Sequence, residues 1–186
     1  MPRPTKKPTP RTAAEVAHRA LILLAVINSG HNNRRAKLVP WLKREGLWKF
    51  VSPQESRFLR NSKPPHKAII NATWRVEALI PLLWALRLYT KFPAPKMFRG
   101  KLRRVMPEIL TPTADFIAAA RLRPESQLRR AQDLTYRTNW ALRDAEIKGK
   151  KPPKSVVPGV IWERHHALNW LVNDDNESWD NVSTDT

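Results

Sequence analysis

The segment from Ala68 to Tyr89 constrains the fold more than any other part of the chain. It reads AIINATWRVEALIPLLWALRLY, and its apolar residues surround nearly the whole circumference of a helix. A helix that is apolar all round is typical of the centre of a helical protein. Arg75, Glu77 and Arg87 lie within it, and charges at membrane depth are costly, so we expect a buried core helix rather than a membrane span.

Capping signals predict where the other main helices begin. Thr12-Ala-Ala-Glu15 and Ser52-Pro-Gln-Glu55 are both capping boxes, in which the first side chain and the glutamate satisfy the free N–H groups of the first turn. Pro124-Glu125 opens a long helical pattern. Further helical patterns cover 34–45, 97–104, 116–122 and 159–172, and the long one ends near residue 147.

These patterns together predict an all-α fold. No run of alternating apolar and polar residues is long enough to predict a strand. We expect a single-domain bundle of about seven helices over residues 12–186, with a central buried helix kinked at Pro81. Residues 1–11 are basic and proline-rich, and we expect a disordered tail there.

The positive charge of the chain is concentrated in its first part. The net charge is +18, yet residues 1–104 hold 23 Lys and Arg against 4 Asp and Glu, whereas residues 105–186 hold 11 against 12. Such asymmetry predicts an acidic protein partner or non-specific nucleic acid, and a solvated basic surface without a ligand is the alternative. The candidate binding residues are Arg34, Arg35, Lys37, Lys43, Arg44, Trp48, Arg103 and Arg104.

Sequence-specific reading of a DNA duplex is not expected. Pro40 interrupts the would-be recognition helix at 34–45, and that helix has no Asn or Gln to read a base. Trp48 lies between basic residues, where it could stack on a base or pack a loop. The sequence therefore favours salt-sensitive contact with phosphates.

Several kinds of site are not expected from the motifs. The chain has no cysteine, and GxGxxG, GxxxxGK[ST] and HExxH do not occur. We therefore expect no metal and no cofactor. We also expect a cytoplasmic protein without membrane insertion, and the sequence leaves its oligomeric state open.

Two helices carry the residues that could support catalysis. Glu163 comes three residues before His166, and a carboxylate one turn from an imidazole can support a general base. Tyr136 and Arg137 lie on the long helix, where Arg137 could hold an anion. A satisfied structural network is the alternative for the first pair, and an exposed ladder of ion pairs is the alternative for the long helix.

Three segments resemble a known bacterial family. TWRVEALIPLLWAL at 73–86, LTYRTNWALRD at 134–144, and ERHHALNW at 163–170 with the end of the chain from Trp179 are similar to the proteins grouped as domain of unknown function 4272. The resemblance implies a helical domain and no assigned activity. Many members have glycine after the LLWAL segment, where this chain has Arg87.

The spacing of charges in these segments suggests a buried polar network. We expect carboxylates and guanidiniums to meet near the centre of the bundle, because buried charges must be paired. The residues concerned are Glu77, Arg137, Arg143, Asp144, Glu163, Arg164 and Asp180.

The leading functional prediction is a non-catalytic binding or adaptor module whose basic half engages an acidic protein or nucleic acid. One alternative is a hydrolase-type enzyme that uses Glu163, His166, Tyr136 and Arg137. The other is one member of a toxin and antitoxin or immunity pair.

Overall fold

The computed structural model describes residues 10–31, 34–174 and 176–185. Within them it has seven α-helices, three short 3₁₀ helices and no strand. The α-helices are α1 (Ala13–His31), α2 (Arg35–Arg44), α3 (Pro53–Arg60), α4 (His66–Ala85), α5 (Ala114–Ala119), α6 (Glu125–Ile147) and α7 (Pro158–Val172). The 3₁₀ helices are η1 (Trp48–Phe50), η2 (Leu102–Arg104) and η3 (Trp179–Asn181). The all-α prediction is confirmed.

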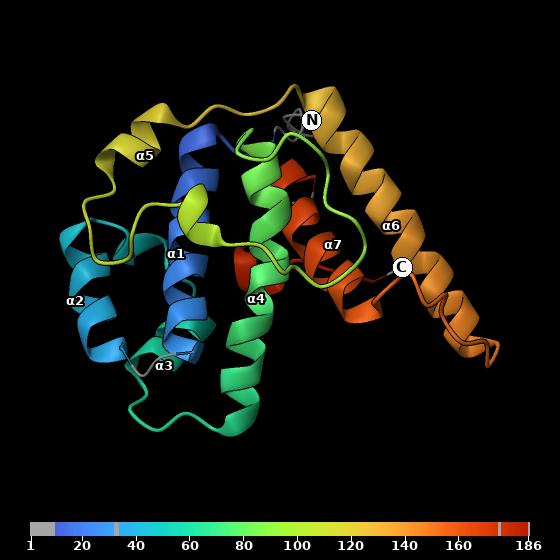
Figure 1. Ribbon diagram of the computed structural model, residues 1–186, viewed down its shortest axis with the longest axis horizontal. Coiled ribbons are helices and arrows are strands. Elements are labelled where there is room, and N and C mark those ends of the chain that lie inside the picture. Colours follow the sequence, from blue (N-terminus) through green and yellow to red (C-terminus); the bar gives the residue numbers. More distant parts are fainter. Residues whose placement is uncertain (1–9, 32–33, 175, 186) are drawn as a thin grey trace, which may run out of the picture.

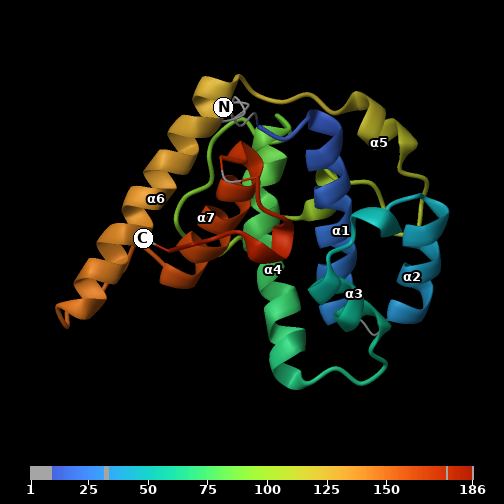
Figure 2. The same cartoon turned by 180° about the vertical axis from the view of Figure 1, so that it is seen from behind.

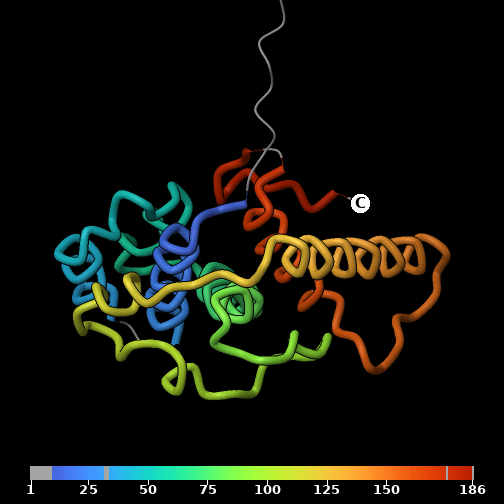
Figure 3. Tube along the Cα trace, turned by 90° about the horizontal axis from the view of Figure 1, so that it is seen from above, coloured from blue at the N-terminus to red at the C-terminus, as the bar shows by residue number. Residues whose placement is uncertain are grey.

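Four long helices pack in a row. α1 packs on α4, α4 on α7, and α7 on α6, while α2, α3 and α5 cover the far side of α1 (Figure 1). Seen from above, α4 stands nearly end-on in the middle of the row (Figure 3). The second half of α4, from Glu77 to Ala85, is completely buried, which confirms the central helix that its composition predicted.

The predicted boundary of the N-terminal tail needs a correction. Arg11 donates its backbone N–H to the carbonyl oxygen of Leu171 at 2.9 Å, and its guanidinium donates to the carbonyl of Glu177 at 2.6 Å. Arg11 is therefore part of the fold, held by free carbonyls at the end of α7 and beyond it. The rest of the predicted tail, residues 1–9, lies outside the described residues.

α1 is long and apolar enough to cross a membrane by length and composition alone. In the fold, 67% of its most apolar window is buried, and its side chains form much of the core. A core helix and a signal sequence both have these properties, so the absence of membrane insertion stays a prediction.

α4 ends earlier than expected because Arg87 adopts a left-handed conformation with φ of 64°. The N–H of Leu88 donates to the carbonyl of Leu83, and the N–H of Arg87 to that of Trp84, which is the Schellman arrangement of a helix end. Glycine is the residue that adopts this conformation without strain. Pro81 lies inside α4, nearer this end than its middle.

The predicted helix over 97–104 was wrong, since only the 3₁₀ helix η2 forms there. The backbone of this region binds distant side chains instead. The N–H of Phe98 donates to the carboxylate of Glu77, and the carbonyl of Lys96 accepts from Arg164. The carbonyl of Lys96, which a helix beginning at Met97 would use for its first hydrogen bond, is thereby engaged by a side chain of α7.

Candidate polyanion-binding surface

Exposed cations gather from the start of α2, through α3, to the first turn of α4. Arg34, Lys37, Lys43 and Arg44, four of the candidate binding residues, are all exposed. Further exposed cations follow at Lys49, Arg57, Arg60, Lys63 and Lys67. We call this set the α2–α3 patch. Figure 2 shows α2 and α3 side by side at the edge of the molecule.

Arg35 is a correction to the predicted binding set. Its side chain lies on the inner face of α2 and is only 8% exposed. It donates to the carbonyl of Ser29 at 2.7 Å, in the last turn of α1, and its guanidinium lies over the ring of Phe58. A helix C-terminus attracts a cation because its last carbonyls lack partners. Arg35 therefore holds α2 against α1.

Trp48 packs between cations. Lys43 and Arg60 lie over its ring at 5.9 Å and 5.1 Å from the centroid, and the ring is half-buried against the core. Of the two roles left open for this residue, packing of the turn is the one that the contacts support. The patch therefore presents charged groups rather than a stacking platform.

A second group of exposed cations lies on the segment between α4 and α5. Lys91, Lys96, Arg99, Lys101, Arg103 and Arg104 are all exposed, and we call this set the loop patch. The segment crosses in front of α1 and reaches the end of α2 (Figure 1), where Arg44 donates to the carbonyl of Leu110. The two patches thus approach each other at the end of α2, while α3 and the loop segment lie on opposite faces of α1 (Figures 1 and 2).

The few acidic residues of the basic half are all engaged in hydrogen bonds or ion pairs. Glu15 closes the capping box of α1 with Thr12. Glu45, on the C-cap of α2, accepts from the N–H of Thr113 at 3.0 Å and from Arg44. Burial alone would raise the pKa of Glu45, but these hydrogen bonds outweigh it and lower the pKa below its ordinary value.

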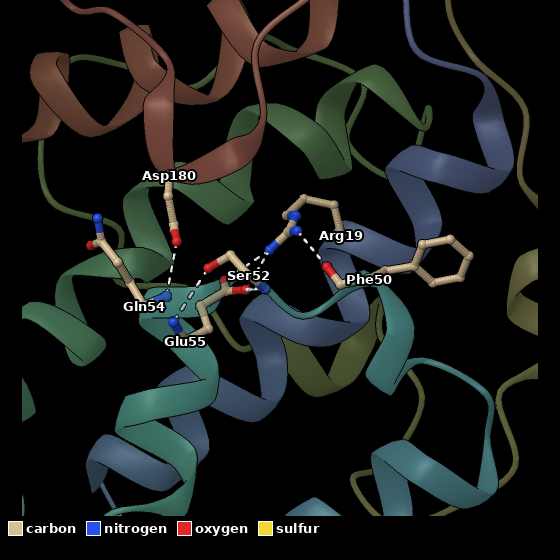
Figure 4. Close-up of polar contacts among 6 residues, drawn as sticks. All are labelled: Arg19, Phe50, Ser52, Gln54, Glu55 and Asp180. Atoms are coloured by element: carbon tan, nitrogen blue, oxygen red, sulfur yellow. Dashed lines mark hydrogen bonds and ion pairs between the residues drawn. The ribbon is translucent and has the colours of Figure 1, made fainter.

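Glu55 has two structural roles at once. Its carboxylate completes the capping box of α3 by accepting from the N–H of Ser52, and it accepts two bonds of 2.8 Å and 2.7 Å from Arg19 of α1. Arg19 also donates to the carbonyl of Phe50, so the pair fixes the turn that leads into α3 (Figure 4). Both side chains are buried, with exposed fractions of 6% and 8%.

Glu77 helps to fix the backbone of the segment that carries the loop patch. It pairs with Arg164 of α7 at 2.9 Å, and both side chains are buried. Arg164 also donates to the carbonyls of Pro93, Ala94 and Lys96, while the other carboxylate oxygen of Glu77 accepts from the N–H of Phe98. Two buried side chains thereby fix the backbone from 93 to 98, within the segment that carries the loop patch.

The predicted network was wrong for its members on α6. Arg137 pairs with Asp133, Arg143 with Glu146, and Asp144 with Lys148, all on the exposed surface of that helix. α6 turns these residues away from α7, because Leu128, Ala131, Thr135 and Asn139 form its buried face. Asp180 lies in η3 and accepts from the N–H of Gln54 at the start of α3 (Figure 4).

The residues considered for hydrolysis do not form one cluster. Glu163 is buried and pairs with Arg75 at 3.1 Å, and His166 packs against the ring of Trp179. Tyr136 contacts His165 rather than His166, and Arg137 points outward. Within the described residues, no hydrogen bond, ion pair or ring contact joins any two of the four candidates.

Burial decides the protonation of the α7 residues. It lowers the pKa of His165 and of His166 to about 4, so both are neutral at pH 7. Burial also raises the pKa of Glu163 and outweighs the attraction of Arg75. These are the electrostatics of a packed interior, in which charge is disfavoured.

A cavity of about 740 Å³ lies between α1, α4 and the segment from Met97 to Ile109. Its walls are mostly apolar, with Lys101 and Arg103 at its margin. None of the four hydrolase candidates lines it within the described part of the chain. In the same residues, no group of three or more His, Asp or Glu side chains could hold a metal ion.

Sequence reasoning missed part of the surface and the residues that support it. Arg57, Arg60, Arg99 and Lys101 are as exposed as the predicted cations, and the charge count alone could have included them. Glu55 and Glu163 pair with Arg19 and Arg75, which lie on helices distant in the sequence. No local sequence pattern indicates such pairs.

The fold and surface define an all-α protein with two groups of exposed cations. A model of the family described as Domain of unknown function (DUF4272) matches residues 2–182, so the chain belongs to this family. No curated protein and no solved structure matches the chain.

Proposed function

We propose that this protein is a non-catalytic module that binds the phosphate backbone of nucleic acid through the α2–α3 patch and the loop patch. One observation carries the proposal. All four acidic residues of positions 1–104 are engaged in caps or ion pairs, and among the exposed lysines and arginines of the two patches only Arg44 forms an ion pair within the described residues. Uncompensated cations of this density attract a polyanion.

Phosphates fit this surface better than bases do. Lys43 and Arg60 already lie over the ring of Trp48, and Lys49 lies over the ring of Phe50. Arg and Lys side chains that are free to move can follow a regular line of phosphates without reading a sequence. We therefore expect binding that is non-specific and depends steeply on salt.

The proposal is tested by fluorescence anisotropy with a labelled duplex of about 20 base pairs. If about six phosphates are engaged, the affinity should fall by about 10³-fold or more between about 50 mM and 200 mM NaCl. Lys101→Glu/Arg103→Glu/Arg104→Glu should weaken binding strongly. The matched control is Lys150→Glu/Lys151→Glu/Lys154→Glu, which changes the net charge equally on the loop after α6 and should have a much smaller effect.

Two results would count against phosphate binding by these patches. An equal loss in both triple variants would mean that only the overall charge matters. Equal affinity for polyglutamate of the same charge would point to an acidic protein partner.

A further inference from the structure

The outer face of α6 combines exposed apolar side chains with charged residues. In Figures 1 and 2 the C-terminal half of α6 extends beyond the body of the molecule. α7 is the helix that packs closely on it among the described elements. Trp140 is 52% exposed and Ile147 is 85% exposed on this helix. Large apolar side chains exposed on a projecting helix are typical of a contact surface.

Charged residues on this face alternate in sign. Asp133, Arg137, Asp144 and Lys148 recur at spacings of four and seven, so they line one side of the helix. That side is opposite the buried face formed by Leu128, Ala131, Thr135 and Asn139. The exposed fractions of the four side chains are 50%, 74%, 36% and 58%. Trp140 and Ala141 lie at the centre of the series.

When the series of four charges is read in the opposite direction, each position meets a charge of the opposite sign. If a second copy of α6 runs antiparallel, with the two-fold axis level with Trp140 and Ala141, Asp133 faces Lys148 of the second copy. In the same register Arg137 faces Asp144 of the second copy, and the two Trp140 rings come together at the axis. A parallel pair in register would instead place like charges opposite each other. Such a self-complementary patch is what a closed two-fold interface requires.

We propose that this protein forms an antiparallel homodimer through the outer face of α6. The Trp140 rings bury apolar surface at the centre, and the charges select the register and direction. Each carboxylate already pairs within its own helix, Asp133 with Arg137 and Asp144 with Lys148 at 2.7 Å and 2.8 Å. In the dimer each carboxylate would therefore be shared between a cation of its own helix and a cation of the second copy. Such pairs contribute more to the specificity of the interface than to its affinity.

The length of the interface limits its strength. From Asp133 to Lys148 the helix spans about 22 Å at 1.5 Å per residue. One helix pair of this length buries less surface than the roughly 1,600 Å² of a standard interface. We therefore expect a dissociation constant between about 1 and 100 μM.

Sedimentation velocity tests the proposal with the full chain, freed of nucleic acid by nuclease, from about 5 to 300 μM. Arg137→Glu and Asp144→Arg should each weaken dimerisation at least about tenfold, because each places two like-charged pairs at the interface. An equimolar mixture of the two variants should dimerise again, since Glu at position 137 then faces Arg at position 144. The control Arg143→Glu loses a similar intrahelical pair, with Glu146, on a neighbouring face and should dimerise like the wild type.

Circular dichroism should show equal helicity in all variants. A wild-type chain that stays monomeric at about 300 μM would overturn the proposal. So would a mixture that fails to dimerise, or an Arg143→Glu variant that is as weak as Arg137→Glu.

Discussion

Replacement of Glu77 by Gln removes one charge from the most deeply buried ion pair of the protein. Arg164 would keep its bonds to the carbonyls of Pro93, Ala94 and Lys96 but lose its counter-charge. The loss of one partner from a buried pair costs about 3–5 kcal/mol, and the carbonyl bonds that remain favour the lower end, about 3 kcal/mol. For a chain of 186 residues this corresponds to a decrease in Tm of about 6–12 °C.

Urea denaturation followed by circular dichroism measures this change in the free energy of unfolding. The control is Glu146→Gln, which breaks the pair with Arg143, where both side chains are more than half exposed. That control should cost no more than about 0.5 kcal/mol. A cost below about 1 kcal/mol for Glu77→Gln would refute the view that this pair supports the fold.

Three further predictions concern stability, and urea denaturation tests each. Between pH 7 and about pH 4.5 the fold should lose roughly 2–3 kcal/mol for each of His165 and His166, because these imidazoles take up protons near pH 6.5 in the unfolded chain and near pH 4 in the folded one. The raised pKa of Glu163 offsets part of this loss. An unchanged free energy of unfolding over this pH range would contradict the prediction. Arg87→Gly should stabilise the fold by about 1 kcal/mol, because glycine adopts the positive φ of this position without strain. A loss of stability would show that the hydrogen bond from the Arg87 side chain to the carbonyl of Leu122 contributes more than the strain costs. Ser52→Ala should cost about 1 kcal/mol through loss of the N-cap of α3, and no change would mean that Glu55 alone suffices.

The elements that the sequence predicted best are those defined by local signals. Both capping boxes form with the expected partners, and α6 begins and ends at the predicted residues. Short-range hydrogen bonds decide these positions, so the neighbouring residues carry the information. The glycine expected at position 87 in relatives also has a local cause, the left-handed end of α4.

The errors arose where distant residues decide the structure. The helix expected over 97–104 does not form, and distant side chains bind the backbone at its start instead, Glu77 at Phe98 and Arg164 at Lys96. The charges of α6 were expected inside because their spacing is regular, yet the same spacing fits an outward face equally well. Only the partner helix decides which face turns inward.

Glu77 and Glu55 bind the backbone next to the basic segments, and this affects where in the sequence loss-of-function substitutions are expected. A single lysine on the surface contributes one of many interchangeable phosphate contacts, so its loss is tolerated. A buried glutamate that fixes several backbone groups has no such substitute. In a random screen for variants that no longer bind, most inactivating single substitutions should therefore be found at acidic residues that never touch the ligand. The sensitive positions would lie in the interior of the fold rather than on its surface.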